Sequence, residues 1–207
     1  MTGIRDSKKR NVFEALYEAS ISLFEAKGYD SVTVTEITRA AGVAKGTFFN
    51  HFPAKADILA EWYRRLVAAA IAPPEAAQAP TLTAAALKTC RRTISLCEAT
   101  PELWKATTRL SPTTPAIQIV EAQSDDAVRN AFEGLVDRAK ANGDLPDETD
   151  SPAIADLMLT LFTGTVRQCV VTGQREHILR DLEIRFRAIE HLAAGARLPR
   201  AASKPKK

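Results

Sequence analysis

The sequence predicts an all-α protein, with an N-terminal three-helix unit that contains a helix-turn-helix and a larger C-terminal helical domain. Apolar residues recur at helical spacing along most of the 207-residue chain. Two short helical stretches near residue 40 are separated by a bend that contains glycine. The composition, 45% hydrophobic and 26% charged, is that of a globular protein.

The first predicted helix ends at Gly28, because glycine readily adopts the left-handed conformation that closes a helix. One face of this helix is apolar at the 3.6-residue period, and we interpret it as core that supports the following motif. That row consists of Val12, Leu16, Ala19 and Leu23. A basic arm precedes this helix and consists of Arg5, Lys8, Lys9 and Arg10. The simplest interpretation is that these side chains are solvated at the start of the helix.

The helix-turn-helix begins with a capping box formed by Thr33 and Glu36, in which side chains satisfy free backbone N–H groups. A helix is therefore expected from Val34 to Gly42. After the bend, a second helix is expected over residues 45–52, and Pro53 stops it.

The second helix of this motif has two unlike faces. Phe48 and Phe52 are four residues apart and should pack inward. From Ile37 to Ala56 the chain has three basic side chains and no acidic one, which suits a surface that approaches phosphates. Without further evidence, the pair of helices could also be only a packing unit. The outward residues are Lys45, Thr47, Phe49, Asn50 and His51.

Helical patterns continue to the end of the chain, with breaks at proline and glycine. The segment 73–80 contains three prolines and is predicted to be a linker. The expected helices run from Lys55 to Pro73, from Thr81 or Thr83 past Cys97, over 102–110, from Ile117 to Gly143, over 152–172 and over 175–194.

Composition and motifs argue against several protein classes. No apolar run approaches the length of a membrane span and the N-terminus has no signal-peptide core, so we expect a soluble cytoplasmic protein. Cys90, Cys97 and Cys169 lack a metal-ligand spacing, and we interpret them as core residues, with a thiol sensor as the alternative. No phosphate loop or zinc ligand set occurs. The positive motif, the helix-turn-helix, decides the matter, and we predict no cofactor, no metal and no enzymatic activity.

The N-terminal part resembles the tetracycline-repressor (TetR) family of bacterial transcription regulators. The resemblance implies an all-helical homodimer that binds a palindromic DNA operator, most often as a repressor, and a C-terminal domain that binds a small molecule and releases the DNA. It rests on Phe24, Gly28, Tyr29, Thr33, Val34, Ile37, Ala41, Gly42, Val43, Lys45, Gly46, Thr47, Phe49, His51, Phe52, Lys55 and Leu59.

With this resemblance, the expected fold is an N-terminal three-helix helix-turn-helix DNA-binding domain plus a C-terminal helical ligand-binding and dimerisation domain. The expected domains are 1–56 for DNA binding, 57–196 for ligand binding and dimerisation, and 197–207 as a basic, disordered tail. The last two long helices are expected to form the dimer interface. In the family, a basic arm before the first helix can also reach DNA.

The expected partners are double-stranded operator DNA, a second copy of the chain and a small-molecule effector, with no membrane. Ala44 and Phe49 depart from the family, which usually has Ser or Thr and Tyr at these positions. The residues expected to contact DNA are Thr33, Lys45, Gly46, Thr47, Phe49, Asn50, His51 and Lys55.

The effector is expected to be largely apolar or aromatic, because ligand sites are mostly apolar with a few polar groups. The alternative for each candidate residue is plain core, which is the commoner role of such side chains. The alternatives for the whole protein are a helical ligand-binding or interaction protein with a degenerate DNA-binding head, and an enzyme with an unrecognised active site. The candidate effector residues are Trp62, Leu66, Arg92, Trp104, Thr107, Phe132, Met158 and Phe162.

Overall fold

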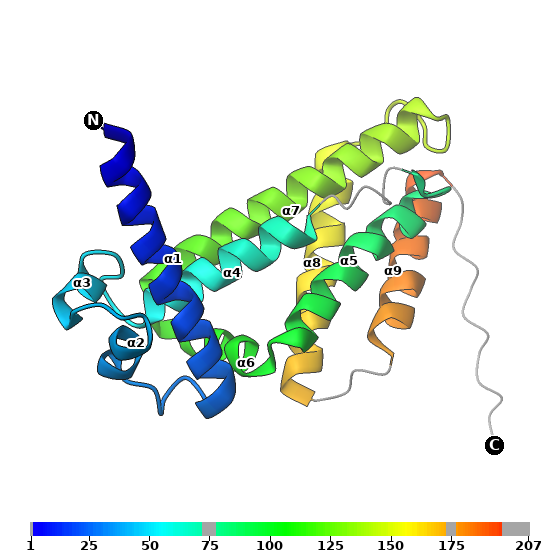
Figure 1. Ribbon diagram of the computed structural model, residues 1–207. Helices are drawn as coiled ribbons and strands as arrows, with labels where there is room; N and C mark the ends of the chain where they lie inside the picture. The colour runs from blue at the N-terminus through cyan, green and yellow to red at the C-terminus, as the bar shows by residue number, and fades with distance from the viewer. Residues whose placement is uncertain (1, 72–77, 173–176, 196–207) are drawn as a thin grey trace, which may run out of the picture. The chain divides into compact units, whose positions relative to one another are not determined.

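The structure, a computed structural model, describes residues 2–71, 78–172 and 177–195, and these residues form helices and no strand (Figure 1). The predicted all-α fold is therefore confirmed. The helices are α1 (Thr2–Lys27), α2 (Val34–Ala40), α3 (Lys45–Phe49), α4 (Ala56–Ala70), α5 (Leu82–Ala99), α6 (Pro101–Leu110), the 3₁₀ helix η2 (Ser111–Thr113), α7 (Pro115–Ala141), α8 (Ser151–Thr172) and α9 (Ile178–Ala193).

The chain packs as two compact units, and the division runs through α5 and α7. The first unit combines residues 1–69 with 95–124, and the second combines 70–94 with the chain from 125 onward. Helices α4 and α6 thus pack in the same unit as the helix-turn-helix. The predicted boundary between residues 56 and 57 concerns function and stays a prediction.

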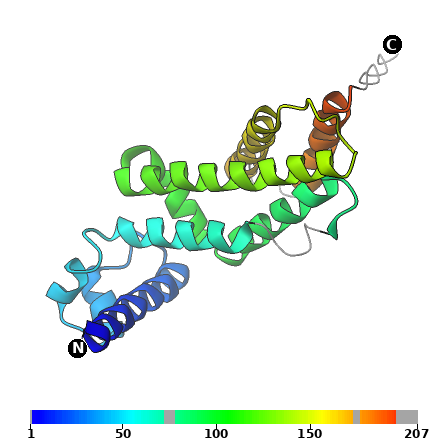
Figure 2. The same cartoon turned by 90° about the horizontal axis from the view of Figure 1, so that it is seen from above.

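In the first unit, α1, α2, α3 and α4 lie close together (Figure 2), and each contributes at least one fully buried apolar side chain. On α1 these side chains are Leu16 and Phe24. The apolar row predicted for the first helix is therefore partly core, because Leu16 is buried whereas Leu23 is only half-buried. The other fully buried members are Ile37, Phe48, Ile58 and Leu59.

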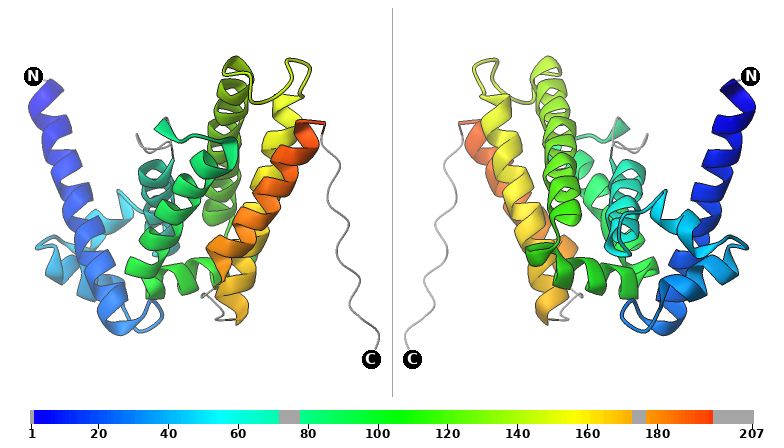
Figure 3. Two further views of the ribbon diagram at one scale, coloured as in Figure 1. Left: turned by 90° about the vertical axis from the view of Figure 1, so that its right-hand side faces the viewer. Right: turned by 90° about the vertical axis from the view of Figure 1, so that its left-hand side faces the viewer.

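In the second unit, α8 and α9 run side by side in opposite directions (Figure 3). The ring of Phe132 on α7 is fully buried and meets Phe162 of α8 and Phe186 of α9, with ring centroids 6.3 Å and 6.0 Å away. Edge-to-face contacts of this kind add to the energy of apolar burial. Phe132 therefore joins the three long helices.

Helix α2 begins with the predicted capping box. The backbone N–H of Glu36 donates to Thr33 Oγ1 at 3.2 Å, and the backbone N–H of Thr33 donates to the Glu36 carboxylate at 2.9 Å. The ammonium of Lys27 at the end of α1 also donates to that carboxylate, at 3.0 Å. These bonds, the one from the Thr33 backbone above all, lower the pKa of Glu36 to about 2.

Two predicted boundaries were wrong. The basic arm does not precede the first helix, because α1 begins at Thr2 and contains it. The second helix of the motif ends at Phe49, and the chain then turns so that the N–H groups of His51 and Phe52 both donate to the Phe48 carbonyl. Most of the predicted linker, the start of the predicted last helix and the tail lie outside the described residues.

Replacing Glu36 by Gln tests the charge in the capping box. Because the folded-state pKa is lowered from 4.5 to about 2, the carboxylate stabilises the fold above pH 4.5 and loses this effect as the pH falls toward 2. Glu36→Gln should lower the thermal midpoint at neutral pH, and the difference from wild type should shrink through that window.

The control is Glu18→Gln, which removes an exposed charge of α1 outside the capping box. Thermal unfolding followed by circular dichroism across the pH range measures both variants. A Glu36→Gln difference that does not change with pH would contradict the assignment.

Candidate nucleic-acid interface

The bend between α2 and α3 fixes the direction in which α3 leaves the body of the first unit. Gly42 adopts the left-handed conformation, with φ of +68°, which a side chain would strain. The Val43 N–H donates to the Thr38 carbonyl at 2.9 Å and closes the turn. Ala44 stands at the N-cap of α3 and offers no side-chain hydrogen bond, as its residue type predicts.

The two faces of α3 separate as predicted. Phe48 is fully buried and Phe52, just beyond the helix, is nearly so, with their ring centroids 5.7 Å apart. Lys45 and Asn50 are exposed, and half of the Phe49 side chain remains exposed although the residue is aromatic. An exposed aromatic ring beside polar and basic side chains is suited to contact with a thymine methyl group or a sugar.

A groove of about 520 Å³ lies between α1 and α3. Lys8 and Lys9 of the basic arm reach it from one helix, and three of the predicted DNA contacts reach it from the other side. The basic arm and α3, which we call the reading helix, therefore share one surface. The groove is lined by Asp6, Lys8, Lys9, Val12, Thr47, Asn50 and His51.

The imidazole of His51 is part of this groove. Its pKa is lowered by burial first and by the nearby charge of Lys9 second. Its ring centroid lies 6.2 Å from that of Phe13 on α1. His51 is thus held against α1 and kept largely neutral near pH 7, where it can accept or donate a single hydrogen bond.

Two further predicted DNA contacts have structural partners. The Lys55 ammonium donates to the carbonyls of Tyr29 and Val32, each at 2.8 Å, and lies 4.0 Å above the Tyr29 ring. The Thr33 hydroxyl donates to the Glu36 carboxylate at 2.9 Å in the capping box. Both residues hold the loop before α2, and their contacts with phosphate stay predictions.

Gly46 is exposed on α3, and a Cβ built there would meet no heavy atom of the described residues within 4 Å. Packing inside the chain therefore does not require glycine at this position. The absence of a side chain leaves the backbone of α3 open to a partner that approaches from outside.

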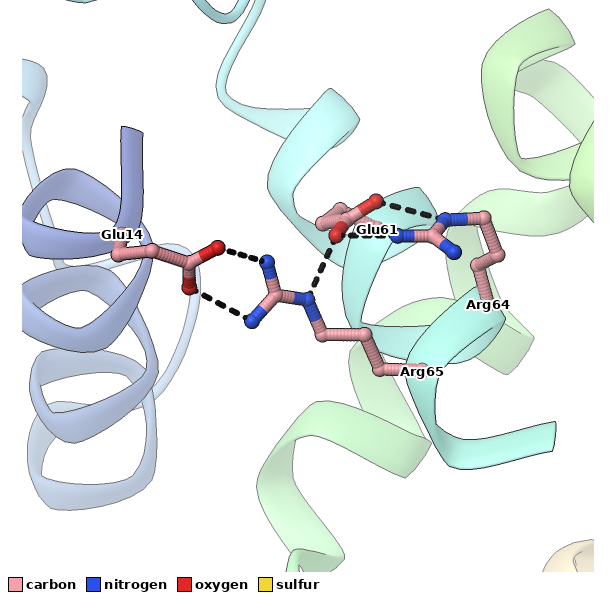
Figure 4. Close-up of polar contacts among 4 residues, drawn as sticks. All are labelled: Glu14, Glu61, Arg64 and Arg65. Carbon is pink, nitrogen blue, oxygen red and sulfur yellow. Dashed lines mark hydrogen bonds and ion pairs between the residues drawn. The ribbon is translucent and has the colours of Figure 1, made fainter. Parts of the chain in front are cut away.

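A network of four charged side chains joins α1 to α4 (Figure 4). The Arg65 guanidinium donates two hydrogen bonds to the Glu14 carboxylate at 2.8 Å and one to Glu61 at 2.6 Å. Arg64 donates to the same Glu61 at 2.7 Å and 2.9 Å. Sequence reasoning missed this network, although the four-residue spacing of Glu61 and Arg65 on one helix was a signal.

The candidate effector residues divide between the two units. Trp62, Leu66, Trp104 and Thr107 belong to the first unit, and Arg92, Phe132, Met158 and Phe162 to the second. The apolar members of the second set are buried in the core around α7 and α8, whereas Arg92 is exposed.

Within the first set, the rings of Trp62 and Trp104 meet edge to face at 6.2 Å, and Tyr63 stacks on Trp104 at 6.1 Å. Trp104 Nε1 and Thr107 Oγ1 are buried and have no hydrogen-bond partner among the described residues. Buried polar atoms usually find a partner. These two atoms are therefore the candidate polar anchors of the first set.

A sequence model described as bacterial regulatory proteins, tetR family, matches residues 16–62, from the middle of α1 into α4. The chain belongs to the TetR family. YwcC of Bacillus subtilis (strain 168), an uncharacterized HTH-type transcriptional regulator, is 42% identical over 52 residues, which are 25% of this chain and 23% of YwcC. The match to YwcC therefore spans about a quarter of each chain.

Two transcriptional repressors are similar to this chain over most of their length. The HTH-type transcriptional repressor DhaR of Mycobacterium sp. (strain GP1) is 22% identical over 182 residues, which are 86% of this chain and 92% of DhaR. The structure of Thermus thermophilus FadR, a TetR-family repressor in complex with lauroyl-CoA, superposes with a TM-score of 0.70 at 19% identity and covers 94% of this chain and 100% of FadR. At such identity the likeness shows the fold.

None of the helices in the described parts of this TetR-family chain combines the length and apolar composition of a membrane span. Within the same parts, no group of three or more His, Cys, Asp or Glu side chains is placed to hold a metal ion. Cys90 and Cys97 are both buried on α5, and burial raises the pKa of the Cys90 thiol, which disfavours the reactive thiolate.

Replacing Lys55 by Met tests its role in the loop before α2. The variant keeps the aliphatic stem and removes two charge-assisted hydrogen bonds to backbone carbonyls, so the free energy of unfolding should fall by about 1–3 kcal/mol. Chemical denaturation measures this change. Lys45→Met is the matched control, because Lys45 is exposed on α3, and it should change stability by less than about 0.5 kcal/mol. Equal stability of the two variants would show that the Lys55 contacts contribute nothing.

Proposed function

We propose that this TetR-family protein is a ligand-responsive transcriptional repressor that binds a palindromic operator as a homodimer. The observation that carries the proposal is the groove in which basic side chains of α1 and polar side chains of the reading helix face the same space. Such a surface suits duplex DNA, because phosphate contacts supply affinity and base contacts supply sequence preference. A DNA-binding regulator of this kind acts in the cytoplasm, where the bacterial chromosome lies.

Each residue that is expected to contact DNA has a proposed role. Lys45, Thr47 and Asn50 approach base edges or the adjacent phosphates, and Phe49 makes apolar contact. His51 makes one hydrogen bond to the DNA backbone, and Lys8 and Lys9 contact the same backbone. Direct bonds from Lys or Asn to bases are the usual means of reading a major groove. Thr33, Gly46 and Lys55 are proposed to approach the phosphates from the starts of α2, α3 and α4.

The homodimer is proposed to form through α8 and α9, as the sequence predicted. Leu157 of α8 and Ile184 and Leu192 of α9 are large apolar side chains that are more than half exposed, at 54%, 60% and 56%. Exposed apolar side chains gathered on one helix pair are typical of a surface that another chain covers. A two-fold dimer would present two reading helices to two half-sites of a palindrome.

The effector site is proposed to lie at α4 and α6 in the first unit. Trp62, Tyr63 and Trp104 supply aromatic surface. Trp104 Nε1 supplies one donor and Thr107 Oγ1 one donor or acceptor, and neither atom has a hydrogen-bond partner in the part of the chain that the structure describes. The two polar atoms come from residues three apart on α6, so they face one side of that helix. A largely apolar or aromatic ligand with a hydrogen-bond acceptor fits this arrangement.

The test of DNA binding is fluorescence anisotropy of the purified protein on duplex tiles from the region that flanks its own gene. Wild type should bind one tile tightly and keep that preference at moderate salt. Lys45→Ala/Asn50→Ala should weaken binding to that tile by about tenfold or more, because a good base contact contributes about 1–3 kcal/mol.

The matched control is Lys105→Ala/Asn142→Ala, which removes the same two chemical groups outside α1 to α4. It should bind like wild type. Weak binding of wild type to every tile, lost in salt and unchanged by Lys45→Ala/Asn50→Ala, would instead support a helical ligand-binding or interaction protein with a degenerate DNA-binding head.

The test of the effector site uses intrinsic fluorescence. The chain has two tryptophans, and both belong to the proposed site. Binding of an aromatic carboxylate such as 2-naphthoate, or of lauroyl-CoA, the ligand of the FadR complex, should change this fluorescence. Trp104→Phe keeps most of the ring surface and removes the donor, so it should weaken binding of an acceptor-bearing ligand by about twofold to tenfold.

A matched loss in Trp62→Phe would mean that ring size rather than the Trp104 N–H determines affinity, and it would contradict the proposed donor. DNA release by the same ligand, measured with the anisotropy assay, would connect the effector site to repression. A ligand that binds and leaves the DNA complex intact would contradict that connection.

A further inference from the structure

We propose that Arg65 is a positioning residue for DNA binding, because its guanidinium fixes α1 on α4 and so sets the place of His51 and the C-terminal end of the reading helix. The proposal rests on the proposed function, since it concerns the accuracy with which the reading surface is presented to DNA. Arg65 itself does not line the groove between α1 and α3.

The contacts of Arg65 define one relative placement of two helices. Both terminal nitrogens of the guanidinium donate to Glu14 on α1 at 2.8 Å, and its Nε donates to Glu61 on α4 at 2.6 Å (Figure 4). Its central carbon lies 4.1 Å from the centre of the Tyr17 ring on α1. A planar group bonded on two edges and stacked on one face is restrained in angle as well as in distance.

The residue next to Glu14 carries this placement to the reading helix. Phe13 stacks on Phe52 with ring centroids 4.7 Å apart and planes tilted by 24°, and its ring also lies 6.2 Å from that of His51. Phe52 in turn meets Phe48, the buried residue of α3. A rotation or shift of α1 on α4 therefore moves the side chains that hold the end of α3.

The charges of the network are matched so that it stays ionised. Hydrogen bonds from Arg65 lower the pKa of Glu14 against the opposing effect of burial. Burial would raise the pKa of Glu61, but hydrogen bonds from Arg64 and Arg65 outweigh it and the pKa is lowered. Burial raises the pKa of Tyr17 to about 12, so its ring stays neutral under the guanidinium.

An ordinary exposed ion pair contributes little to stability, and Arg65 is one-third exposed. Arg65 differs from the neighbouring Arg64 in the helix to which its guanidinium is bonded. Arg64 is bonded twice to Glu61 on its own helix, whereas Arg65 is bonded twice across to α1. Arg64 therefore makes a charge contact within one helix, whereas Arg65 makes a contact between helices that positions the reading helix.

The experiment compares Arg65→Lys with Arg64→Lys in the full-length protein. Both variants keep the positive charge and lose the planar fork, so long-range attraction to DNA is unchanged. Affinity is measured by anisotropy for the preferred tile and for a duplex of scrambled sequence. Arg65→Lys should weaken binding to the preferred tile by about tenfold while binding to the scrambled duplex changes little. Arg64→Lys should leave both affinities as in wild type.

Glu14→Gln removes the other partner of the bond and should reproduce the loss, with no further loss in the Glu14→Gln/Arg65→Lys double variant. Circular dichroism shows that each variant is folded at the assay temperature. An unchanged ratio of the two affinities in Arg65→Lys, or an equal change in Arg64→Lys, would overturn the proposal.

Hydrogen exchange of the free protein makes the test independent of DNA binding. Amides of residues 45–52 should exchange faster in Arg65→Lys than in wild type or Arg64→Lys. If wild type prefers no DNA sequence, the proposed function fails, and the exchange result still decides the role of Arg65. Unchanged exchange in Arg65→Lys would contradict the positioning role even where DNA binding is confirmed.

Discussion

The reading helix α3 has five residues and no side-chain cap at its start, and so short a helix has little stability of its own in water. Its position depends on tertiary contacts. Burial of Phe48 and Phe52 anchors its inner face, and the stack of Phe13 on Phe52 ties it to α1. Most other features of the first unit can be understood as means of keeping α1, α2 and α4 where these contacts form.

Three sets of polar contacts hold α1, α2 and α4 in these positions. The capping box and Lys27 fix the start of α2 against the end of α1. Lys55 ties the start of α4 to the carbonyls of the loop between α1 and α2. Arg65 ties the middle of α4 to α1. Because rigid supports leave the outer side chains free to contact a partner, the same arrangement suits sequence reading by Lys45, Thr47 and Asn50.

Local motifs made much of this part predictable from the sequence. The capping box needs two residues three apart, and the left-handed bend needs a glycine at position 42. Both can therefore be predicted from residues that are close together in the sequence. The inward and outward faces of α3 follow from helical spacing. The helical basic arm was missed because its polar sequence lacks the apolar period that marked the rest of α1.

The long-range contacts could not be predicted in the same way. Glu14 and Arg65 are 51 positions apart, and Lys55 meets backbone carbonyls, which carry no sequence signal. The candidate effector set mixed residues of two units, because aromatic and apolar side chains suit a core as well as a ligand site. Only the structure distinguishes Trp104 and Thr107 from the other candidates, because their polar atoms are buried and have no partner within the described ranges.

We propose that this TetR-family chain reads a specific DNA sequence with the surface formed by α1 and α3. Selection of bound duplexes from a fully randomised DNA library tests it most directly, with Lys45→Ala/Asn50→Ala carried in parallel. Wild type should enrich a two-fold symmetric motif, and the double variant should lose it. Enrichment of no motif by wild type, or of the same motif by both proteins, would contradict sequence reading by this surface.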